Sequence, residues 1–389
     1  SCVIETVKRY VGMNWEMVNL TSICRPRQWK TLSMEMLTDK GYSVYGANGK
    51  IGFYKDYTHE FPTLAITCRG ATCGSVHITE AKSYINGNAM ALDAVSKEVD
   101  IKFLYYYFIL RGFKDVISGS AQPQITGEGL SQVQVPLPPL SVQKRIAQIL
   151  DEADELKRKD KELLKKYDEL AQSIFIDMFG DPAKNEKGWE KIVFSDILEK
   201  IESGWSPQCL ERQAEKSEWG ILKLGAVTKC TYKDNENKAL PSFEKPREEI
   251  EVKEGDLLFS RKNTYDLVAA CALVRQTRSK LMLSDLIFRL KMKKHVKVSP
   301  VYLHALLTFP TKMKSVQSLA NGAAGSMPNI SKEKLSSLAI ELPPFTLQKE
   351  FEAIIDIIEK NKNISTNAVR NSANLFQTLI QKAFKGELT

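Results

Sequence analysis

The sequence is poor in the residues that build metal and catalytic centres. Its 389 residues include only four histidines, His59, His77, His295 and His304, and none of them lies in a recognisable motif. The seven cysteines form no CxxC pair, so a zinc site is not expected, and reduced thiols fit a reducing compartment such as the cytoplasm. We therefore expect no metal ion on this chain and structural roles for its histidines.

Long hydrophobic runs and catalytic signatures are also missing. The longest apolar run, residues 103–110, is far shorter than a membrane span, and Ser1–Tyr10 has no signal-peptide core. The sequence contains no Asn/Asp-Pro-Pro-Tyr/Phe tetrapeptide for methylation of an amino group, no glycine-rich cofactor loop after a strand, no Walker sequence and no HExxH. These absences predict a cytoplasmic chain, away from membranes, that binds and positions other molecules and has no catalytic site of its own.

Charge is unevenly distributed along the chain. The formal net charge is +8, and residues 183–342 carry 27 basic against 20 acidic groups. Within residues 261–294, nine lysines and arginines face only Asp266 and Asp285. Such a run suits a polyanion such as nucleic acid, although a solvated surface explains it about as often.

The chain is a tandem repeat. The segment PPLSVQK at residues 138–144 returns as PPFTLQK at residues 343–349, an offset of 205 residues. Shorter matches in the same order relate residues 42–47 to 221–226, 64–70 to 257–263, 102–104 to 301–303 and 120–125 to 325–330. A length of 389 residues suits two or three domains. We infer that one half-molecule, a globular domain followed by a long helix, was duplicated.

A long helix is predicted after each copy of the repeated segment. Apolar residues recur in steps of three and four, with Ser141 and Thr346 as expected N-caps and Gly180 and Gly386 as terminators. A helix of about 39 residues is roughly 58 Å long, so its apolar seam needs a partner, and the other helix is the obvious one. The seam residues expected to pair are Ile146, Ile149, Leu156, Leu163 and Leu170 in the first helix and Phe351, Ile354, Ile358, Leu375 and Leu379 in the second.

Each helix follows a segment that reads as a mixed α/β domain. Residues 42–54 alternate aromatic and polar side chains around an Asn-Gly turn, which predicts a β-hairpin. Residues 64–67 predict a buried strand that ends in the small-residue loop 69–74, and residues 100–113 predict a core helix.

Taken together, these motifs resemble the specificity subunit of a type I restriction-modification system. The resemblance lies in YxVYGANG at residues 42–49, SxQPQIT at 120–126, PLPPLSxQxxI at 136–146, FGDP at 179–182 and the repetition of the whole. It covers essentially the full chain. The second helix departs from the pattern, because Asn361, Ser365 and Ser372 dilute its seam.

The resemblance implies an α+β fold class with a pseudo-twofold internal repeat. Two target recognition domains, residues 1–140 and 181–342, would alternate with two conserved long helices, residues 141–180 and 343–389, that pair as an antiparallel coiled coil. Each domain would read one half of a split, asymmetric sequence in double-stranded DNA, and the helices would set the spacing between the halves.

The resemblance also implies partners. The helices would dock two modification subunits, which bind S-adenosylmethionine and methylate adenine at N6. Restriction subunits that use ATP and Mg²⁺ to cut DNA can join this core, in a system that defends against phage. No cofactor is expected on this chain itself.

Candidate DNA-binding residues lie in the predicted loops. Base edges are read by polar side chains and phosphates are held by lysine and arginine. The candidates are Tyr45, Asn48, Lys50, Arg69, Thr72, Gln122 and Gln124 in the first domain and Lys223, Arg261, Lys262, Asn263, Tyr265, Arg278, Ser326 and Asn329 in the second.

Two alternatives stay open at the level of sequence. One is the DNA-reading part of a fused nuclease-methyltransferase, against which the missing catalytic motifs argue. The other is a coiled-coil scaffold with no DNA role, which a DNA-binding assay at two salt concentrations would separate from the first hypothesis.

Overall fold

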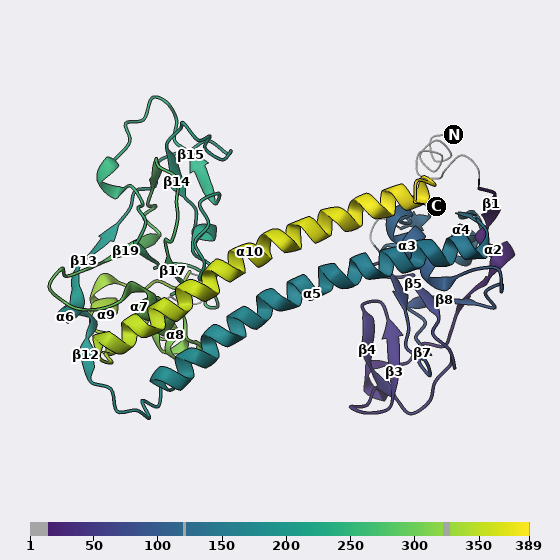
Figure 1. Ribbon diagram of the computed structural model, residues 1–389, viewed down its shortest axis with the longest axis horizontal. Coiled ribbons are helices and arrows are strands. Elements are labelled where there is room, and N and C mark those ends of the chain that lie inside the picture. Colours follow the sequence, from purple (N-terminus) through teal and green to yellow (C-terminus); the bar gives the residue numbers. More distant parts are fainter. Residues whose placement is uncertain (1–14, 120–121, 322–326, 389) are drawn as a thin grey trace. The chain divides into compact units, whose positions relative to one another are not determined.

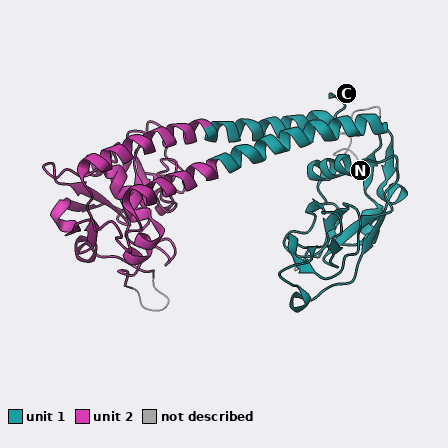
Figure 2. Ribbon diagram, turned by 60° about the horizontal axis from the view of Figure 1, so that its bottom comes forward, with its two compact units in different colours: residues 1–163, 365–389 teal, residues 164–364 magenta. Residues whose placement is uncertain are grey.

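The computed structural model describes residues 15–119, 122–321 and 327–388 (Figure 1). It divides into two compact units, which we call unit 1 (residues 1–163 and 365–389) and unit 2 (residues 164–364) (Figure 2). Two 40-residue helices, α5 (Leu140–Phe179) and α10 (Phe345–Phe384), contribute residues to both units. The predicted α+β fold class with two long helices is therefore confirmed.

Unit 1 is built on two small sheets. One has the strand order β2-β8-β5-β6, and the other has the order β4-β3-β7, in which β3 and β7 run parallel. The strands are β2 (Arg25–Gln28), β3 (Tyr42–Gly46), β4 (Gly49–Tyr54), β5 (Leu64–Thr67), β6 (Val76–Ile78), β7 (Tyr84–Ile85) and β8 (Ala89–Asp93). The hairpin expected at residues 42–54 and the strand expected at 64–67 are both present.

Short pairs and helices complete unit 1. They are β1 (Met17–Asn19) with β11 (Gln134–Pro136), β9 (Ile117–Ser118) with β10 (Gln124–Ile125), α2 (Leu20–Ile23), η1 (Met34–Met36), α3 (Ile101–Arg111) and α4 (Gly127–Ser131). Helix α3 is the expected core helix, and Asp100 caps it by accepting hydrogen bonds from the N–H groups of Lys102 and Phe103. Its Phe103 and Tyr107 are buried against Phe384 at the end of α10, so α3 joins the domain to the helix.

Unit 2 repeats this topology. Its sheets have the orders β13-β19-β16-β17 and β15-β14-β18, and again one pair, β14 with β18, is parallel. The strands are β12 (Lys191–Val193), β13 (Leu198–Ser203), β14 (Gly220–Leu222), β15 (Asn237–Ala239), β16 (Leu257–Ser260), β17 (Cys271–Leu273), β18 (Leu281–Met282), β19 (Ile287–Met292) and β20 (Ala339–Glu341). The helices are α6 (Phe194–Ile197), η2 (Leu224–Ala226), η3 (Glu248–Ile250), α7 (Pro300–Thr308), α8 (Pro310–Gln317) and α9 (Lys332–Ser336).

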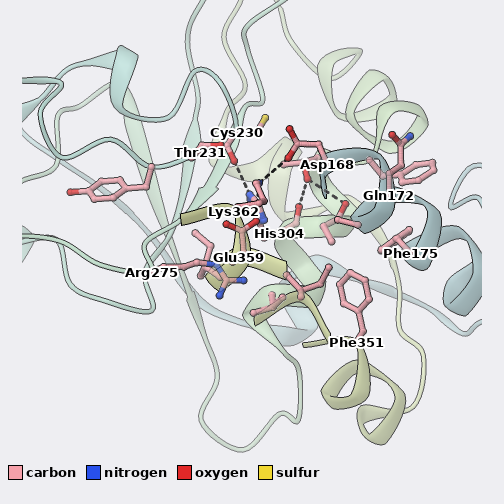
Figure 3. Close-up of a pocket in the computed structure, with 18 of the residues that line it drawn as sticks. Asp168, Gln172, Phe175, Cys230, Thr231, Arg275, His304, Phe351, Glu359 and Lys362 are labelled. Atoms are coloured by element: carbon pink, nitrogen blue, oxygen red, sulfur yellow. Dashed lines mark hydrogen bonds and ion pairs between the residues drawn. The ribbon is translucent and has the colours of Figure 1, made fainter. Parts of the chain in front are cut away.

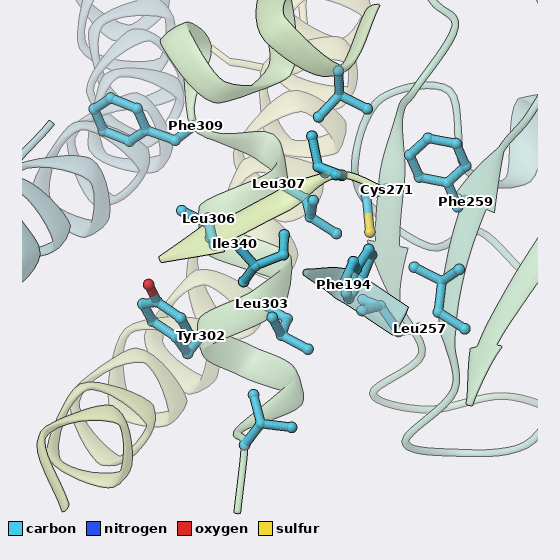
Figure 4. Packing of buried hydrophobic residues seen from close by; sticks show 14 of the residues in the cluster. Phe194, Leu257, Phe259, Cys271, Tyr302, Leu303, Leu306, Leu307, Phe309 and Ile340 are labelled. Atoms are coloured by element: carbon cyan, nitrogen blue, oxygen red, sulfur yellow. The ribbon is translucent and has the colours of Figure 1, made fainter. Parts of the chain in front are cut away.

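The core of unit 2 lies around α7, which occupies the place of α3. Tyr302, Leu303 and Leu306 of α7 are at most 1% exposed and share one hydrophobic cluster with Phe194 and Leu257 (Figure 4). The ring of Tyr302 lies 4.8 Å from that of Phe179 in α5, as Phe103 lies 5.2 Å from Phe384 in unit 1. Tyr302 thus corresponds to Phe103, an offset of 199 residues within these two helices.

Gln143 and Gln348, the glutamines of the repeated PPLSVQK and PPFTLQK segments, connect each long helix to its domain by hydrogen bonds. Gln143 is fully buried, and its Oε1 accepts a hydrogen bond from the N–H of Asp100, the N-cap of α3, at 2.9 Å. Its Nε2 donates to the carbonyls of Glu98 and Pro138 at 2.9 and 2.8 Å. Gln348 repeats the arrangement, since its Oε1 accepts from the N–H of Ser299, the N-cap of α7, at 2.9 Å.

Gln143→Leu or Gln348→Leu should lower the free energy of unfolding by about 2–3 kcal/mol, because buried backbone groups lose their partners. Gln148→Leu on the exposed face of α5 is the matched control and should change it by less than about 0.5 kcal/mol. Urea denaturation of the full chain measures both effects, and equal losses in Gln143→Leu and Gln148→Leu would contradict this connecting role.

The long helices pair in antiparallel fashion within each unit. In unit 2, Phe179 of α5 lies 5.2 Å from Phe351, while Asp168 forms an ion pair with Lys362 at 2.8 Å. Earlier residues of α5 therefore lie beside later residues of α10, so the two helices run in opposite directions here. In unit 1, Ile146 and Leu150 of α5 share a buried cluster with Ile380 and Phe384 of α10.

The buried faces of the helices differ from the expected seam. Ile146, Phe351, Ile358 and Leu379 lie in the hydrophobic clusters, but Ile149 is only half-buried. Five residues of the predicted seam are 37–46% exposed: Leu156, Leu163, Leu170, Ile354 and Leu375. Most residues of the predicted seam lie at seven-residue intervals, and such positions drift by about 20° per heptad around a straight helix. The buried stripe instead includes Leu150, Phe376 and the two serines, Ser365 and Ser372, that interrupt the pattern in α10.

The expected N-caps also need correction. Helices α5 and α10 begin at Leu140 and Phe345, and the carbonyls of Pro139 and Pro344 accept the first helical hydrogen bonds. Ser141 and Thr346 therefore lie inside the first turn. Gly180, with φ 76°, follows the last residue of α5 as the terminator predicted from the sequence.

Candidate nucleic-acid interface

In unit 1, two segments far apart in sequence cross at the end of β5. The N–H of Ile125 donates to the carbonyl of Cys68 at 3.0 Å, and the N–H of Gly70 donates to the carbonyl of Pro123 at 3.2 Å. Arg69 and Gln124 lie opposite each other in an isolated antiparallel bridge between these bonds. We call this arrangement, residues 68–70 with residues 122–125, the unit 1 crossing.

The hairpin turn between β3 and β4 lies next to the unit 1 crossing. The hydroxyls of Thr67 and Thr72 donate to the carbonyl of Ala47 at 3.0 and 2.6 Å, and Thr72 Oγ1 lies 3.1 Å from Asn48 Oδ1. The structure therefore brings together five of the seven candidates of the first domain, all of them exposed: Asn48, Arg69, Thr72, Gln122 and Gln124.

Tyr45 and Lys50 contact other residues of unit 1. Tyr45 is 9% exposed, and its hydroxyl accepts a hydrogen bond from the N–H of Glu80 at 3.3 Å, so it is a core residue and its candidacy needs correction. Strand β3 lies between β4 and β7, and four of its five residues are buried. Lys50 is exposed, but Glu80 pairs with its ammonium group at 3.5 Å and the ring of Phe53 lies 4.6 Å from it.

Unit 2 contains the same crossing. The N–H of Ile330 donates to the carbonyl of Arg261 at 2.8 Å, and the N–H of Asn263 donates to the carbonyl of Pro328 at 3.3 Å. Lys262 and Asn329 lie opposite each other in an isolated bridge. We call residues 261–263 with residues 327–330 the unit 2 crossing. Lys262 therefore occupies the position of Arg69, and Asn329 occupies that of Gln124.

The side chains of the unit 2 crossing differ in how far they are available to a ligand. Arg261 is half-buried, because its Nε donates to Asn329 Oδ1 at 3.1 Å and its guanidinium lies 5.1 Å from the ring of Phe288. Asn263 is 6% exposed and its Oδ1 accepts from the N–H of Thr264, so it shapes the loop. Tyr265 is 61% exposed, so its ring is open to a ligand.

Two further candidates, Lys223 and Arg278, are not part of the unit 2 crossing. Lys223 pairs with Glu236 at 3.1 Å, and Arg278 donates to the carbonyls of Glu218 and Ser279 at 3.1 and 3.0 Å. Ser326 lies outside the described residues.

Sequence reasoning missed some polar groups beside the crossings. Asn321 exchanges two backbone hydrogen bonds with Asn329, at 2.9 and 3.0 Å, and Lys334 Nζ donates to Asn321 Oδ1 at 2.6 Å. In unit 1, the ring of His77 packs against Gly49 of the hairpin turn, and burial lowers its pKa, which favours the neutral imidazole. No local sequence signal marks these residues, because tertiary pairing alone brings them to the site.

The side chains of the two crossings are of types that bind nucleic acid. In both, a cationic residue lies opposite a carboxamide residue in the backbone bridge, and these side-chain types suit a phosphate and a base edge respectively. Among the described residues, no cluster of three or more His, Cys, Asp or Glu side chains could hold a metal ion. Within the same residues, no helix is long and apolar enough to cross a bilayer.

Sequence comparison finds specificity subunits of type I restriction enzymes among the relatives of this chain. The specificity subunit of the type I restriction enzyme EcoEI from Escherichia coli is 35% identical over 170 residues, which are 43% of this chain and 28% of that protein. The EcoKI specificity subunit from Escherichia coli (strain K12) is 25% identical over 278 residues, 66% of this chain and 58% of that protein. The alignments thus span less than two thirds of these relatives' own lengths.

Solved structures show the same fold. The S subunit of a type I restriction-modification system from M. genitalium superimposes with a TM-score of 0.64 at 14% identity, covering 95% of this chain and 96% of that chain. A chain from a type I R-M system assembly gives a TM-score of 0.52 at 15% identity, covering 97% of this chain and 99% of that chain. At these identities the likeness shows the fold alone.

The family model described as "Type I restriction modification DNA specificity domain" matches residues 13–166 and again residues 186–374. The two matches cover most of the chain and fall on its two repeats, and they confirm the resemblance seen in the sequence. This chain therefore belongs to the type I restriction modification DNA specificity family.

Proposed function

We propose that this chain is the DNA-reading subunit of a type I restriction-modification complex. Residues 1–140 and 181–342 are its two target recognition domains, and each reads one half of a bipartite, asymmetric site in double-stranded DNA. The observation that carries the proposal is the crossing built twice with the same hydrogen bonds, in a chain whose two halves each match a DNA specificity domain. Duplicated reading domains suit a site with two separate halves.

Within each crossing, the cation and the carboxamide have different tasks. Arg69 and Lys262 hold phosphates, which supply most of the affinity and position the domain. Gln124 and Asn329 read a base edge, because a carboxamide donates and accepts at once and can pair with adenine N6 and N7. Asn48, Thr72, Gln122 and Tyr265 add contacts from the neighbouring loops, which differ between the two domains and give the site its asymmetry.

The long helices act as the spacer between the half-sites and as the docking surface for two modification subunits. Leu156, Leu163 and Leu170 are 41–46% exposed at seven-residue intervals on α5, a spacing that suits a helix from a partner protein. The modification subunits bind S-adenosylmethionine and methylate adenine at N6. Restriction subunits with ATP and Mg²⁺ join the same core, and this chain contributes recognition and no catalysis.

Sequencing of methylated adenines in a host that carries this chain with its modification subunit tests the proposal. We expect one bipartite motif with two specified halves and an unspecified spacer. Gln124→Ala should relax only one half, whereas Asn329→Ala should relax only the other. Methylation by the purified chain without any partner, or a motif that both variants leave unchanged, would contradict the proposal.

A further inference from the structure

Unit 2 contains a cavity of about 400 Å³ between the domain and the two long helices (Figure 3). Its walls include the rings of Phe175, Phe309 and Phe351, and Phe175 lies 5.1 Å from Phe309 and 5.7 Å from Phe351. Asp168 and Lys362 lie at its polar side, paired at 2.8 Å. The volume falls within the range of ligand sites in proteins.

The internal repeat shows what fills the corresponding place in unit 1. With the helix offset of 205, Ala171 in the cavity wall corresponds to Phe376; with the offset of 199 between α3 and α7, Ala305 corresponds to Tyr106. Phe376 and Tyr106 are both 3% exposed, and their rings lie 6.0 Å apart. Two aromatic side chains thus occupy in unit 1 the space that two alanines leave open in unit 2.

The groups around this space are retained in unit 2. Lys157, which holds its ammonium 4.1 Å from the centre of the Phe376 ring, corresponds to Lys362. Asp151 accepts a hydrogen bond from the hydroxyl of Tyr106 at 2.7 Å. Its counterpart, Asp356, accepts a hydrogen bond from Arg275 at 2.6 Å. Lys362 itself pairs with Asp168 and Glu359, at 2.8 and 3.0 Å. The cation that lies over an aromatic face in unit 1 therefore has its counterpart, Lys362, in the wall of the cavity in unit 2.

We propose that this cavity is a binding site for a single aromatic ring with a polar edge, such as a phenol. The ring takes the place of Phe376 and Tyr106, packs on Phe175 and Phe351, and presents its face to the Lys362 ammonium. It is supplied by a small molecule or by a side chain of a partner protein, and the chemistry of the site is the same in both cases.

Binding of 4-fluorophenol to the purified full-length chain, followed by ¹⁹F NMR, tests this site. Wild type should bind it saturably. Ala171→Phe combined with Ala305→Tyr, which copies unit 1, should weaken binding at least tenfold. Ala353→Phe, the same enlargement at an exposed position of α10, is the matched control and should leave binding unchanged. Lys362→Met, which adds no bulk to the wall, should weaken binding about threefold to tenfold through loss of the cation over the ring.

Two outcomes would overturn the proposal: no saturable binding by wild type, or equal affinity in wild type, the filled variant and Lys362→Met. Addition of the modification subunit distinguishes a small-molecule ligand from a side chain of that partner. This experiment alone rests on the proposed function. Stoichiometric release of 4-fluorophenol would identify a side chain of that partner as the ring, whereas retention would identify a small-molecule ligand. The binding measurements on the isolated chain use no DNA, so their failure and a failure of DNA recognition are separate results.

Discussion

Replacing Arg69 and Lys262 together by alanine should weaken DNA binding by the purified chain on the order of a hundredfold at moderate salt. A hydrogen bond from a cation to a phosphate stabilises a complex by about 1.5–3 kcal/mol, so each residue contributes roughly tenfold or more. The slope of log affinity against log salt should also become shallower by about 0.9 for each lost phosphate contact, or about 1.8 for the pair. Fluorescence anisotropy with a duplex containing the site, at several salt concentrations, measures both quantities.

These two residues are the right pair because they occupy the same position in the two crossings. Each lies opposite a carboxamide residue in an isolated bridge, Arg69 opposite Gln124 and Lys262 opposite Asn329. Arg261 is a poorer choice, since it hydrogen-bonds Asn329 and packs near Phe288, and its removal would also disturb the fold of the loop.

The matched control is Lys50→Ala combined with Lys223→Ala. It removes the same charge, one cation from each domain, but both lysines are already paired with glutamates, at 3.5 and 3.1 Å. We expect the affinity of the control to stay within about threefold of wild type, because a neighbouring glutamate already offsets the charge of each lysine and neither lysine belongs to a crossing. An equal loss in both double variants would assign the effect to net charge, and an unchanged slope in the Arg69/Lys262 variant would remove the crossings from the interface.

The elements that the sequence predicted correctly are those with local signals. The long helices follow from apolar residues at helical spacing, and Gly180 ends the first of them because it adopts a positive φ at no steric cost. The Asn-Gly pair at residues 48–49 sets the hairpin of β3 and β4. Repetition then extends each local prediction to the second half of the chain.

Side-chain orientation and long-range backbone pairing could not be predicted from local sequence signals. Tyr45 was a candidate DNA-binding residue, but four consecutive residues of β3 are buried and the Tyr45 hydroxyl accepts a hydrogen bond from the N–H of Glu80. The crossings join residues 55 and 67 positions apart, Arg69 with Gln124 and Lys262 with Asn329. Insertions change the repeat offset from 193 at residues 64–70 to 205 at residues 120–125. The sequence match therefore aligns Arg69 with Lys262, but only the structure shows that each lies opposite a carboxamide residue.

Insertion of seven residues into both long helices should keep the two recognised half-sequences and lengthen the unspecified spacer between them. The best positions are between Leu163 and Leu164 in α5 and between Ile364 and Ser365 in α10, which are the boundaries of the two units. Seven residues are close to two helical turns, so the buried faces keep their orientation within about 20°. They add roughly 10 Å of helix, which by length alone corresponds to about three base pairs at 3.4 Å each.

The twist of DNA adds a second consequence to this change of length. Three base pairs turn a duplex of 10–10.5 base pairs per turn by roughly a third of a turn, so the lengthened protein must twist the DNA or bend its helices to engage both halves. We therefore expect weaker modification together with the longer spacer. Insertion into α5 alone is the control, and it should abolish modification, because it moves the buried residues of α5 about 10 Å past their partners in α10. Methylated-adenine sequencing separates the cases, and an active double-insertion variant with an unchanged spacer would show that something other than the helices sets the distance between the half-sites.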